Sequence, residues 1–163
     1  MNTGGGLGVP QRAEDRPLDL DRWASILARH LGPLGVAVGT EPGDFLVKEC
    51  AVNLSEVVTV EERDGVRFVG LDVGWNAMGE RFIYHSLLDV VLCRGADAPL
   101  VREVTISGHI NEGDDVFAED LPFPAVVEGD IVAAINVGSY NASMTSEHCL
   151  RPAARSVFFT DRV

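Results

Sequence analysis

The chain has 163 residues, of which 46% are hydrophobic and 23% charged, so it can bury one sizeable core and is neither disordered nor fibrous. Thirteen basic residues against 25 acidic ones give a formal charge of -12, which disfavours nucleic acid and anionic membrane surfaces as partners. Twelve of the basic residues are Arg and one is Lys48, so any chemistry of this chain that needs its own lysine amine depends on Lys48.

The cysteines and the start of the chain bear on its cellular setting. Cys50, Cys93 and Cys149 are an odd number at wide spacing, which disfavours a disulfide framework or a structural zinc site and favours buried thiols in a reducing, cytoplasmic setting. The Gly-rich, uncharged opening is unlike a secretory signal, and no apolar run approaches the ~20 residues that span a bilayer.

The first 44 residues predict one β/α unit. The opening Gly4-Gly5-Gly6-Leu7-Gly8 suits turns and close approach by a ligand. Apolar residues recur at helical spacing from Leu18 to Leu31, and Gly32-Pro33 ends that helix. A short strand, Val36 to Val38, then leads into the loop Glu41-Pro42-Gly43-Asp44.

After residue 44 the pattern changes to apolar, often β-branched runs separated by turn residues, which is typical of an all-β sandwich or barrel. Asp64-Gly65 predicts a hairpin, and Glu112-Gly113-Asp114 and Glu128-Gly129-Asp130 predict further turns. The expected strands are Phe45 to Val47, Val57 to Val60, Val66 to Leu71, Leu87 to Cys93, Val101 to Ile106, Ile131 to Val137 and Val157 to Phe159.

Four motifs offer chemistry, and each has an ordinary alternative. The backbone N–H groups of Gly4 to Gly6 can wrap a phosphate, or the stretch is a flexible terminus. Glu41 can hold a cation or a protonated ring nitrogen, or it faces water from a turn. The carboxylates of residues 111–115 suit a divalent cation less well than a solvated turn. Tyr140, after a strand, offers a phenol that can reach a phosphate or simply pack.

Taken in order, Gly4-Gly5-Gly6, Glu41-Pro42-Gly43, Asn111-Glu112 and Gly138-Ser139-Tyr140 resemble the fold-type III pyridoxal phosphate decarboxylases, the family of diaminopimelate, ornithine and biosynthetic arginine decarboxylases. The region from Ser143 to Pro152 is nearer the diaminopimelate branch. The resemblance matches the second half of a family member. It implies residues 1–44 as the last part of a cofactor-binding (β/α)8 barrel and residues 45–163 as the C-terminal β domain, so the fold class is mostly β.

The resemblance also implies roles for individual residues. Gly4, Gly5 and Gly6 would contact the phosphate of pyridoxal 5'-phosphate, and Glu41, with Gly43 beside it, would hold the pyridine nitrogen. Tyr140 would approach both cofactor and substrate. Asn111, at the position of the family's proton-donating Cys, and Glu112 would be the catalytic residues and would cross a dimer interface, where Glu112 would also bind the distal ammonium group of a small amino-acid substrate. Further substrate contacts are expected from Tyr84 and Arg81, and no metal ligands are expected.

The sequence departs from the family at several of these positions. The family usually has Cys where Asn111 stands and Arg where Asp44 stands, and its Arg before a Leu-Tyr pair aligns with Glu80. The family's Schiff-base lysine lies in the half of the barrel that this chain does not match. Lys48 is expected to be an ordinary surface or strand lysine.

The sequence therefore predicts the C-terminal part of a pyridoxal phosphate-dependent carboxy-lyase of lysine or polyamine metabolism, inactive alone and making only noncovalent contacts to the cofactor. Its expected partner is a second copy or a complementing N-terminal half-chain. The alternative is a noncatalytic dimerisation or regulatory module.

Overall fold

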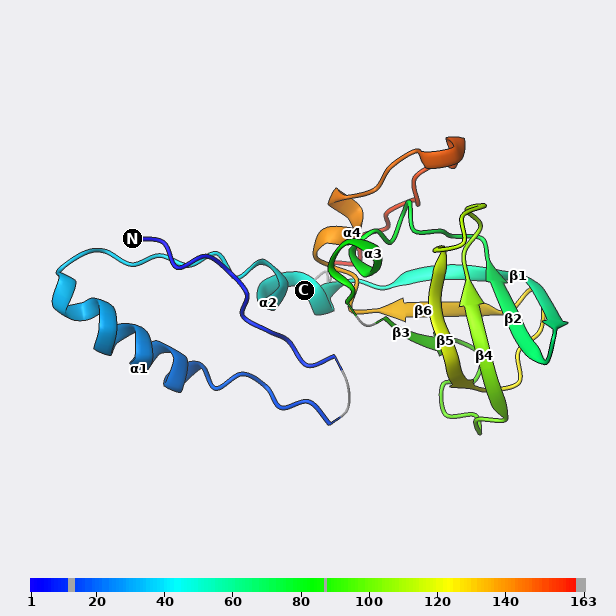
Figure 1. Ribbon diagram of the computed structural model, residues 1–163, viewed down its shortest axis with the longest axis horizontal. Helices are drawn as coiled ribbons and strands as arrows, with labels where there is room; N and C mark the ends of the chain where they lie inside the picture. The colour runs from blue at the N-terminus through cyan, green and yellow to red at the C-terminus, as the bar shows by residue number, and fades with distance from the viewer. Residues whose placement is uncertain (12–13, 87, 161–163) are drawn as a thin grey trace.

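The computed structural model describes residues 1–11, 14–86 and 88–160 and has two parts. Figure 1 shows an elongated N-terminal part on the left, containing α1, and a curled six-stranded sheet on the right. Helix α2 (Gly43–Val47) and the 3-10 turn Lys48–Cys50 connect the two parts. The candidate site residues therefore come from both parts.

Helix α1 (Leu20–Leu31) confirms the predicted amphipathic helix. The carboxylate of Asp19 caps it by accepting the N–H of Arg22 at 2.8 Å, which satisfies one of the free donors of the first turn. Trp23 and Leu27 form a half-buried face, whereas Leu20 and Ile26 are 42% and 49% exposed. No residue of α1 is fully buried, so this helix has an uncovered apolar surface.

The predicted strand Val36 to Val38 is not a regular strand. The chain forms no strand there, and within the described residues it is bridged beside this stretch only between Asn2 and Gly39, in parallel, with the Thr3 N–H donating to the Gly39 carbonyl at 3.0 Å. A single bridge is too little to form a ladder. The parallel course of residues 1–4 and 37–41, joined through α1, retains the geometry of a β/α unit.

The predicted strand Phe45 to Val47 is wrong, because these residues belong to α2. A three-residue apolar run cannot distinguish a strand from a helical turn. Here Asp44 lies in the first turn, where an acidic side chain favours helix, and Lys48 follows at the end of the same segment.

The second part is a mostly β domain, as predicted, whose sheet curls into half of a barrel. In the sheet order β3-β6-β1-β2-β4-β5, only β2 and β4 pair in parallel and the other neighbours are antiparallel. The strands are β1 (Asn53–Arg63), β2 (Val66–Leu71), β3 (Asp89–Leu92), β4 (Arg102–Ser107), β5 (Val116–Phe123) and β6 (Ile131–Ile135).

The hairpin prediction is confirmed, because Asp64 and Gly65 join β1 to β2 with φ of 51° and 82°, as a tight hairpin turn requires. Strand β5 was not predicted from the sequence, since Glu119, Asp120 and Pro122 interrupt its apolar pattern. The sheet tolerates them because β5 is an edge strand. The predicted strand Val157 to Phe159 is wrong: the segment is irregular and exposed.

The hydrophobic core is formed by side chains of all six strands and of the loops beside them. Its largest fully buried apolar side chains are Phe117, Phe123, Leu71, Met78, Leu92 and Ile106. Burying each contributes roughly 1.5–3 kcal/mol, so the sheet is the stable platform of the molecule. At one end of it lie α3 (Glu80–Tyr84), α4 (Tyr140–Ser143) and the turn His148–Leu150 (Figure 1). No described helix is long and apolar enough to cross a membrane.

Candidate functional site

The structure divides the predicted site residues into two groups. Gly4, Gly5, Gly6, Glu41, Gly43, Tyr140 and Tyr84 lie at the junction of the two parts of the chain. Arg81 and Glu112 line a cavity at the end of the sheet, and Asn111 lies beside them. Helix α3 contributes to both groups, because it carries Arg81 toward the cavity and Tyr84 toward the junction.

The glycine loop and Glu41 form a tight hydrogen-bonded unit. The backbone N–H of Glu41 donates to the Gly4 carbonyl at 2.8 Å, and Asn2 Nδ2 donates to Glu41 Oε1 at 2.6 Å. Asn2 Oδ1 in turn accepts the Gly4 N–H at 2.7 Å. A Cβ at Gly5 would lie 2.3 Å from the Glu41 carbonyl oxygen, so only glycine fits there. The sequence predicted both motifs but not Asn2, the residue that orients the Glu41 carboxylate.

The loop after Glu41 contacts the tyrosine pair. A Cβ at Gly43 would lie 3.2 Å from the Tyr140 hydroxyl oxygen, so the phenol reaches the backbone directly at this glycine. The rings of Tyr140 and Tyr84 pack with centroids 5.4 Å apart. The two side chains are 40% and 58% exposed, so a ligand can reach both. Five residues from distant parts of the sequence, Gly5, Glu41, Gly43, Tyr84 and Tyr140, are thus linked by a chain of contacts.

Lys48 is not the surface or strand lysine that the sequence suggested. It is 2% exposed and forms a buried ion pair with Glu80. Asp44 Oδ2 lies 3.6 Å from the same Nζ atom. Glu80 Oε2 also accepts hydrogen bonds from Ser139 at 2.9 Å and Asn141 at 3.2 Å. The network joins α2, α3 and the turn before Tyr140, and the amine of Lys48 is committed to it.

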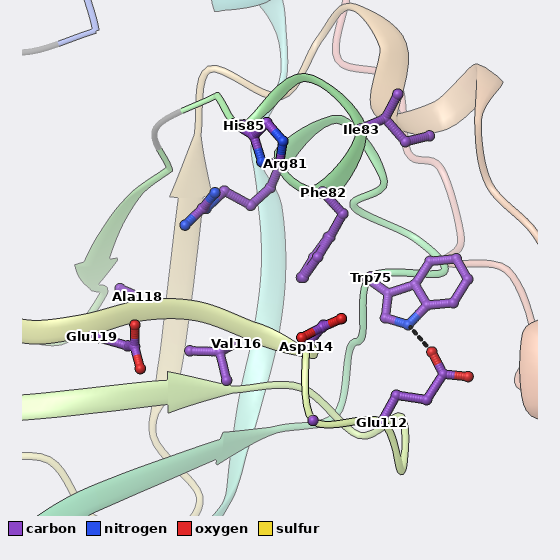
Figure 2. A pocket seen from close by; sticks show the side chains of 11 residues that line it. Trp75, Arg81, Phe82, Ile83, His85, Glu112, Asp114, Val116, Ala118 and Glu119 are labelled. Atoms are coloured by element: carbon purple, nitrogen blue, oxygen red, sulfur yellow. Dashed lines mark hydrogen bonds between the residues drawn. The ribbon is translucent and has the colours of Figure 1, made fainter.

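The cavity at the end of the sheet has a volume of about 610 Å³ and is lined by α3, the loop before it and β5. Figure 2 shows Arg81 and His85 on one side and the carboxylates of Asp114 and Glu119 across from them, with Glu112 at the rim. Three carboxylates against one guanidinium and one imidazole make its lining acidic at neutral pH. The cavity is therefore suited to a ligand that carries an ammonium group.

Trp75 and Asp115 hold Glu112 at that rim. Trp75 Nε1 donates to Glu112 Oε2 at 3.2 Å (Figure 2). Asp115 is 2% exposed and accepts the backbone N–H groups of Trp75 at 2.8 Å and Ile110 at 2.7 Å, which ties the two loops together. Burial raises the pKa of the Asp115 carboxyl, although these two backbone hydrogen bonds partly oppose the shift. The turn at residues 111–115 is therefore solvated on one side only.

Two residues that the sequence did not bring to the site contact Asn111 and Glu112. His148 Nε2 lies 2.5 Å from Glu112 Oε1, and Cys149 Sγ donates to Asn111 Oδ1 at 3.3 Å. The thiol of Cys149 thus lies beside Asn111, the position where the decarboxylases that the chain resembles usually have a cysteine. The expectation of buried thiols is wrong, because Cys50, Cys93 and Cys149 are all exposed. Their wide spacing gave no signal that one of them joins the loop of residues 111–115.

A family model described as the C-terminal sheet domain of pyridoxal-dependent decarboxylase matches residues 35–138. The chain belongs to this decarboxylase family. Diaminopimelate decarboxylase of Methanothermobacter thermautotrophicus is 33% identical over 96% of the chain and 38% of its own length. The Escherichia coli K12 enzyme is 30% identical over 98% of the chain and 42% of its own length.

Among solved structures, diaminopimelate decarboxylase of Helicobacter pylori in complex with L-lysine superposes with a TM-score of 0.82 at 26% identity, covering 93% of the chain and 37% of that protein. The chain thus spans about two-fifths of the length of these decarboxylases. The predicted family, branch and fold are confirmed.

The junction residues fit the pyridoxal phosphate that the decarboxylase family uses. An added Cβ at Gly4 or Gly6 would meet no atom within 4 Å, so open space lies beside the backbone of this loop. Glu41 Oε1 is oriented by Asn2, and no donor among residues 1–11, 14–86 and 88–160 contacts Oε2. A carboxylate held in this way suits a protonated ring nitrogen. Asp44 stands where the family has a cation, so this position offers no positive charge to a phosphate.

Proposed function

We propose that the chain supplies the C-terminal β domain and one side of the cofactor site of a pyridoxal phosphate-dependent decarboxylase that acts on a diamino acid. The observation that carries this proposal is the convergence of the glycine loop, Glu41 and Tyr140, with a contact at Gly5 that excludes a side chain and the Tyr140 hydroxyl close beside Gly43. The boundary between the cofactor-binding part and the β domain is proposed near residue 44.

Each junction residue then has a distinct task. The N–H groups of Gly5 and Gly6 bind the phosphate, since that of Gly4 already donates to Asn2, and the Tyr140 hydroxyl donates a hydrogen bond to it. Glu41 keeps the proton on the pyridine nitrogen, since an ionised carboxylate stabilises the protonated ring. Pyridoxal phosphate supplies the electron-withdrawing ring that takes up the electron pair of the broken bond to CO2. Tyr84 packs on Tyr140 and limits the orientations of the phenol.

Glu112 and Arg81 are proposed to act on the substrate from the cavity. The carboxylate of Glu112, fixed by the Trp75 hydrogen bond, attracts the distal ammonium group of a diamino acid. Arg81 Nε donates to the Phe117 carbonyl at 3.4 Å, which leaves the terminal nitrogens of its guanidinium to face the cavity. Asn111 has no acidic proton to give, so a proton donor at the α-carbon must come from another side chain.

The partner is proposed to be a lysine-bearing half-barrel, with a second copy of the chain at the cavity. Exposed apolar residues of the N-terminal part support a covering protein: Leu20 42%, Ile26 49%, Leu34 55%, Val36 47%, Val38 42% and Leu46 70% exposed. An apolar surface of this extent is typical of an interface. Within one chain, Glu112 lies at the cavity and the glycine loop lies at the junction of the two parts. We therefore expect Glu112 of the second copy to complete the site at the glycine loop.

A noncatalytic module is the second candidate, and one observation favours it. Asp44 and Glu80 occupy positions where the family has arginines, and both lie beside Lys48 in an internal charge network. Arginines at these two positions could bind an anion, whereas Asp44 and Glu80 contact Lys48 and only stabilise the fold. In this case the chain would bind a full-length homologue without restoring activity.

Complementation tests the proposal and separates the two candidates. The chain is co-expressed with the N-terminal half of the related Methanothermobacter diaminopimelate decarboxylase, and CO2 release from diaminopimelate, lysine and ornithine is measured. Activity that depends on both halves supports the decarboxylase. A stable complex without CO2 release from any of the three substrates would overturn it in favour of the module.

Matched variants identify the residues. Glu41→Gln should lower kcat by about 100-fold or more, because a neutral amide does not hold the ring proton. Glu49→Gln, an exposed acid eight residues further along the chain, is the control and should leave activity unchanged. Glu112→Gln should act mainly through KM for the diamino acid, with Glu103→Gln, an exposed acid of β4 outside the cavity lining, as its control.

A further inference from the structure

Three side chains of the kinds that bind transition metals meet outside the glycine loop. Glu112 comes from the loop between β4 and β5, whereas His148 and Cys149 come from the turn His148–Leu150 near the end of the described chain. Their ligand atoms, a carboxylate oxygen, an imidazole nitrogen and a thiol sulfur, all lie within 4.8 Å of one another. We call Glu112, His148 and Cys149 the thiol cluster.

The thiol cluster is positioned by surrounding contacts. Trp75 donates from Nε1 to Glu112 Oε2 at 3.2 Å, and its ring packs on the imidazole of His148 with centroids 4.7 Å apart. One tryptophan therefore fixes two of the three side chains. His148 Nε2 and Glu112 Oε1 are already in contact at 2.5 Å.

The backbone of the turn brings two consecutive side chains to one place. Cys149 and Leu150 have φ of 54° and 56°, in the left-handed region that residues with a side chain seldom adopt. This sharp turn lets His148 and Cys149 both reach Glu112. Left-handed backbone at such residues costs of order 1 kcal/mol and is found disproportionately at binding sites.

The donor set identifies the class of ion. Thiolate, imidazole and carboxylate together are typical of zinc and its neighbours among the transition metals, whereas magnesium and calcium prefer oxygen ligands alone. Zinc bonds of about 2.0–2.3 Å place tetrahedral ligand atoms about 3.5 Å apart. The cluster must contract by at most about 1.3 Å at its widest, which two exposed side chains and one half-buried side chain can do by small rotations.

We propose that Glu112, His148 and Cys149 bind a zinc-class divalent cation, with a fourth position open to water beside the cavity that Glu112 lines. The formal charge of -12 attracts a cation to the chain, and a carboxylate with a thiolate neutralises a charge of two. Binding replaces the hydrogen bond between His148 and Glu112 and releases the thiol proton. This revises the sequence-based expectation of no metal ligands.

The metal site does not rest on the decarboxylase proposal, because all three ligands belong to this chain and none contacts the glycine loop. The two proposals meet at Glu112, which cannot hold a metal and a substrate ammonium group together. Zinc would thus compete with the diamino acid in a complemented enzyme.

Metal titration of the reduced, full chain tests the proposal without pyridoxal phosphate. Co2+ is the probe, since its absorption reports thiolate ligation and tetrahedral geometry, and Zn2+ then displaces it. The expected result is one Co2+ per chain with a thiolate-to-cobalt band, and no comparable binding of Mg2+. Absence of the cobalt spectrum at stoichiometric metal would overturn the proposal.

Variants then locate the ligands. Cys149→Ser should abolish the thiolate band, and His148→Ala and Glu112→Gln should each weaken Zn2+ binding by about tenfold or more. Cys93→Ser is the matched control, because Cys93 is also exposed but lies in a different region. Trp75→Phe keeps a ring against His148 and removes the N–H to Glu112, so it should weaken binding without removing the band. Unchanged affinity in Cys149→Ser, or a loss in Cys93→Ser, would refute the assignment.

Discussion

The replacement of Lys48 by Met separates a structural role for this lysine from a chemical one. Methionine keeps most of the apolar stem but removes the ammonium group. Glu80, which is 2% exposed, would retain only the neutral donors Ser139 and Asn141. An uncompensated buried charge of this kind costs about 3–5 kcal/mol, a large part of the stability of a typical domain. We therefore expect Lys48→Met to unfold at markedly lower urea concentration with an unchanged slope.

A double variant tests the cause of that loss. Glu80→Gln in the Lys48→Met background removes the stranded charge, so it should recover at least about 1 kcal/mol relative to Lys48→Met alone. Arg63→Met is the control, because Arg63 pairs with Glu61 on the surface, where its side chain is 68% exposed, and such pairs contribute about 0–1 kcal/mol. Urea unfolding followed by circular dichroism gives all four free energies.

Reduction with borohydride in the presence of pyridoxal phosphate gives the chemical readout. A lysine committed to Glu80 should not become labelled, and the mass of the folded wild-type chain should show no pyridoxyl adduct at residue 48. Specific labelling of Lys48, or a stability loss below about 1 kcal/mol in Lys48→Met, would refute the argument that the amine serves only the fold.

Four further substitutions, one of them a control, probe the platform beneath the site. Gly138→Ala places a Cβ 2.0 Å from the carbonyl oxygen of the last residue of α2, so it should destabilise the chain by more than about 2 kcal/mol in thermal unfolding. Gly113→Ala is the control: its Cβ would meet nothing within 4 Å, so the variant should unfold at nearly the wild-type temperature. Phe117→Ala, in the fully buried core, should cost about 3–5 kcal/mol, and a loss under about 1 kcal/mol would contradict the described packing. The Arg94 guanidinium lowers the pKa of Asp130 through a hydrogen bond, so this carboxylate stabilises the fold above its ordinary pKa and the contribution fades as the pH falls through its lowered value. Asp130→Asn should lower the melting temperature at neutral pH and flatten its decline in acid, and an unchanged pH profile would contradict this.

The local predictions that succeeded depend on a pattern that spans several turns of a helix or on residues that favour a tight hairpin. Helix α1 has a capping aspartate and 12 residues of helical spacing, and Asp64-Gly65 fixes a hairpin by its backbone preference alone. Those that failed were three-residue apolar runs. Phe45 to Val47 became helix, and Val157 to Phe159 paired with no strand of the described chain, because so few residues carry no period.

The family and the mostly β domain followed from the sequence alone. The same short motifs in a fixed order led to the hypothesis that the glycine loop, Glu41 and Tyr140 form the cofactor site. The burial of Lys48 against Glu80, and the contacts of Cys149 and His148 with Asn111 and Glu112, could be seen only in the three-dimensional structure. Those contacts join residues more than 30 positions apart. Such pairings depend on how the sheet and its end loops fold back on each other, which no local spacing encodes.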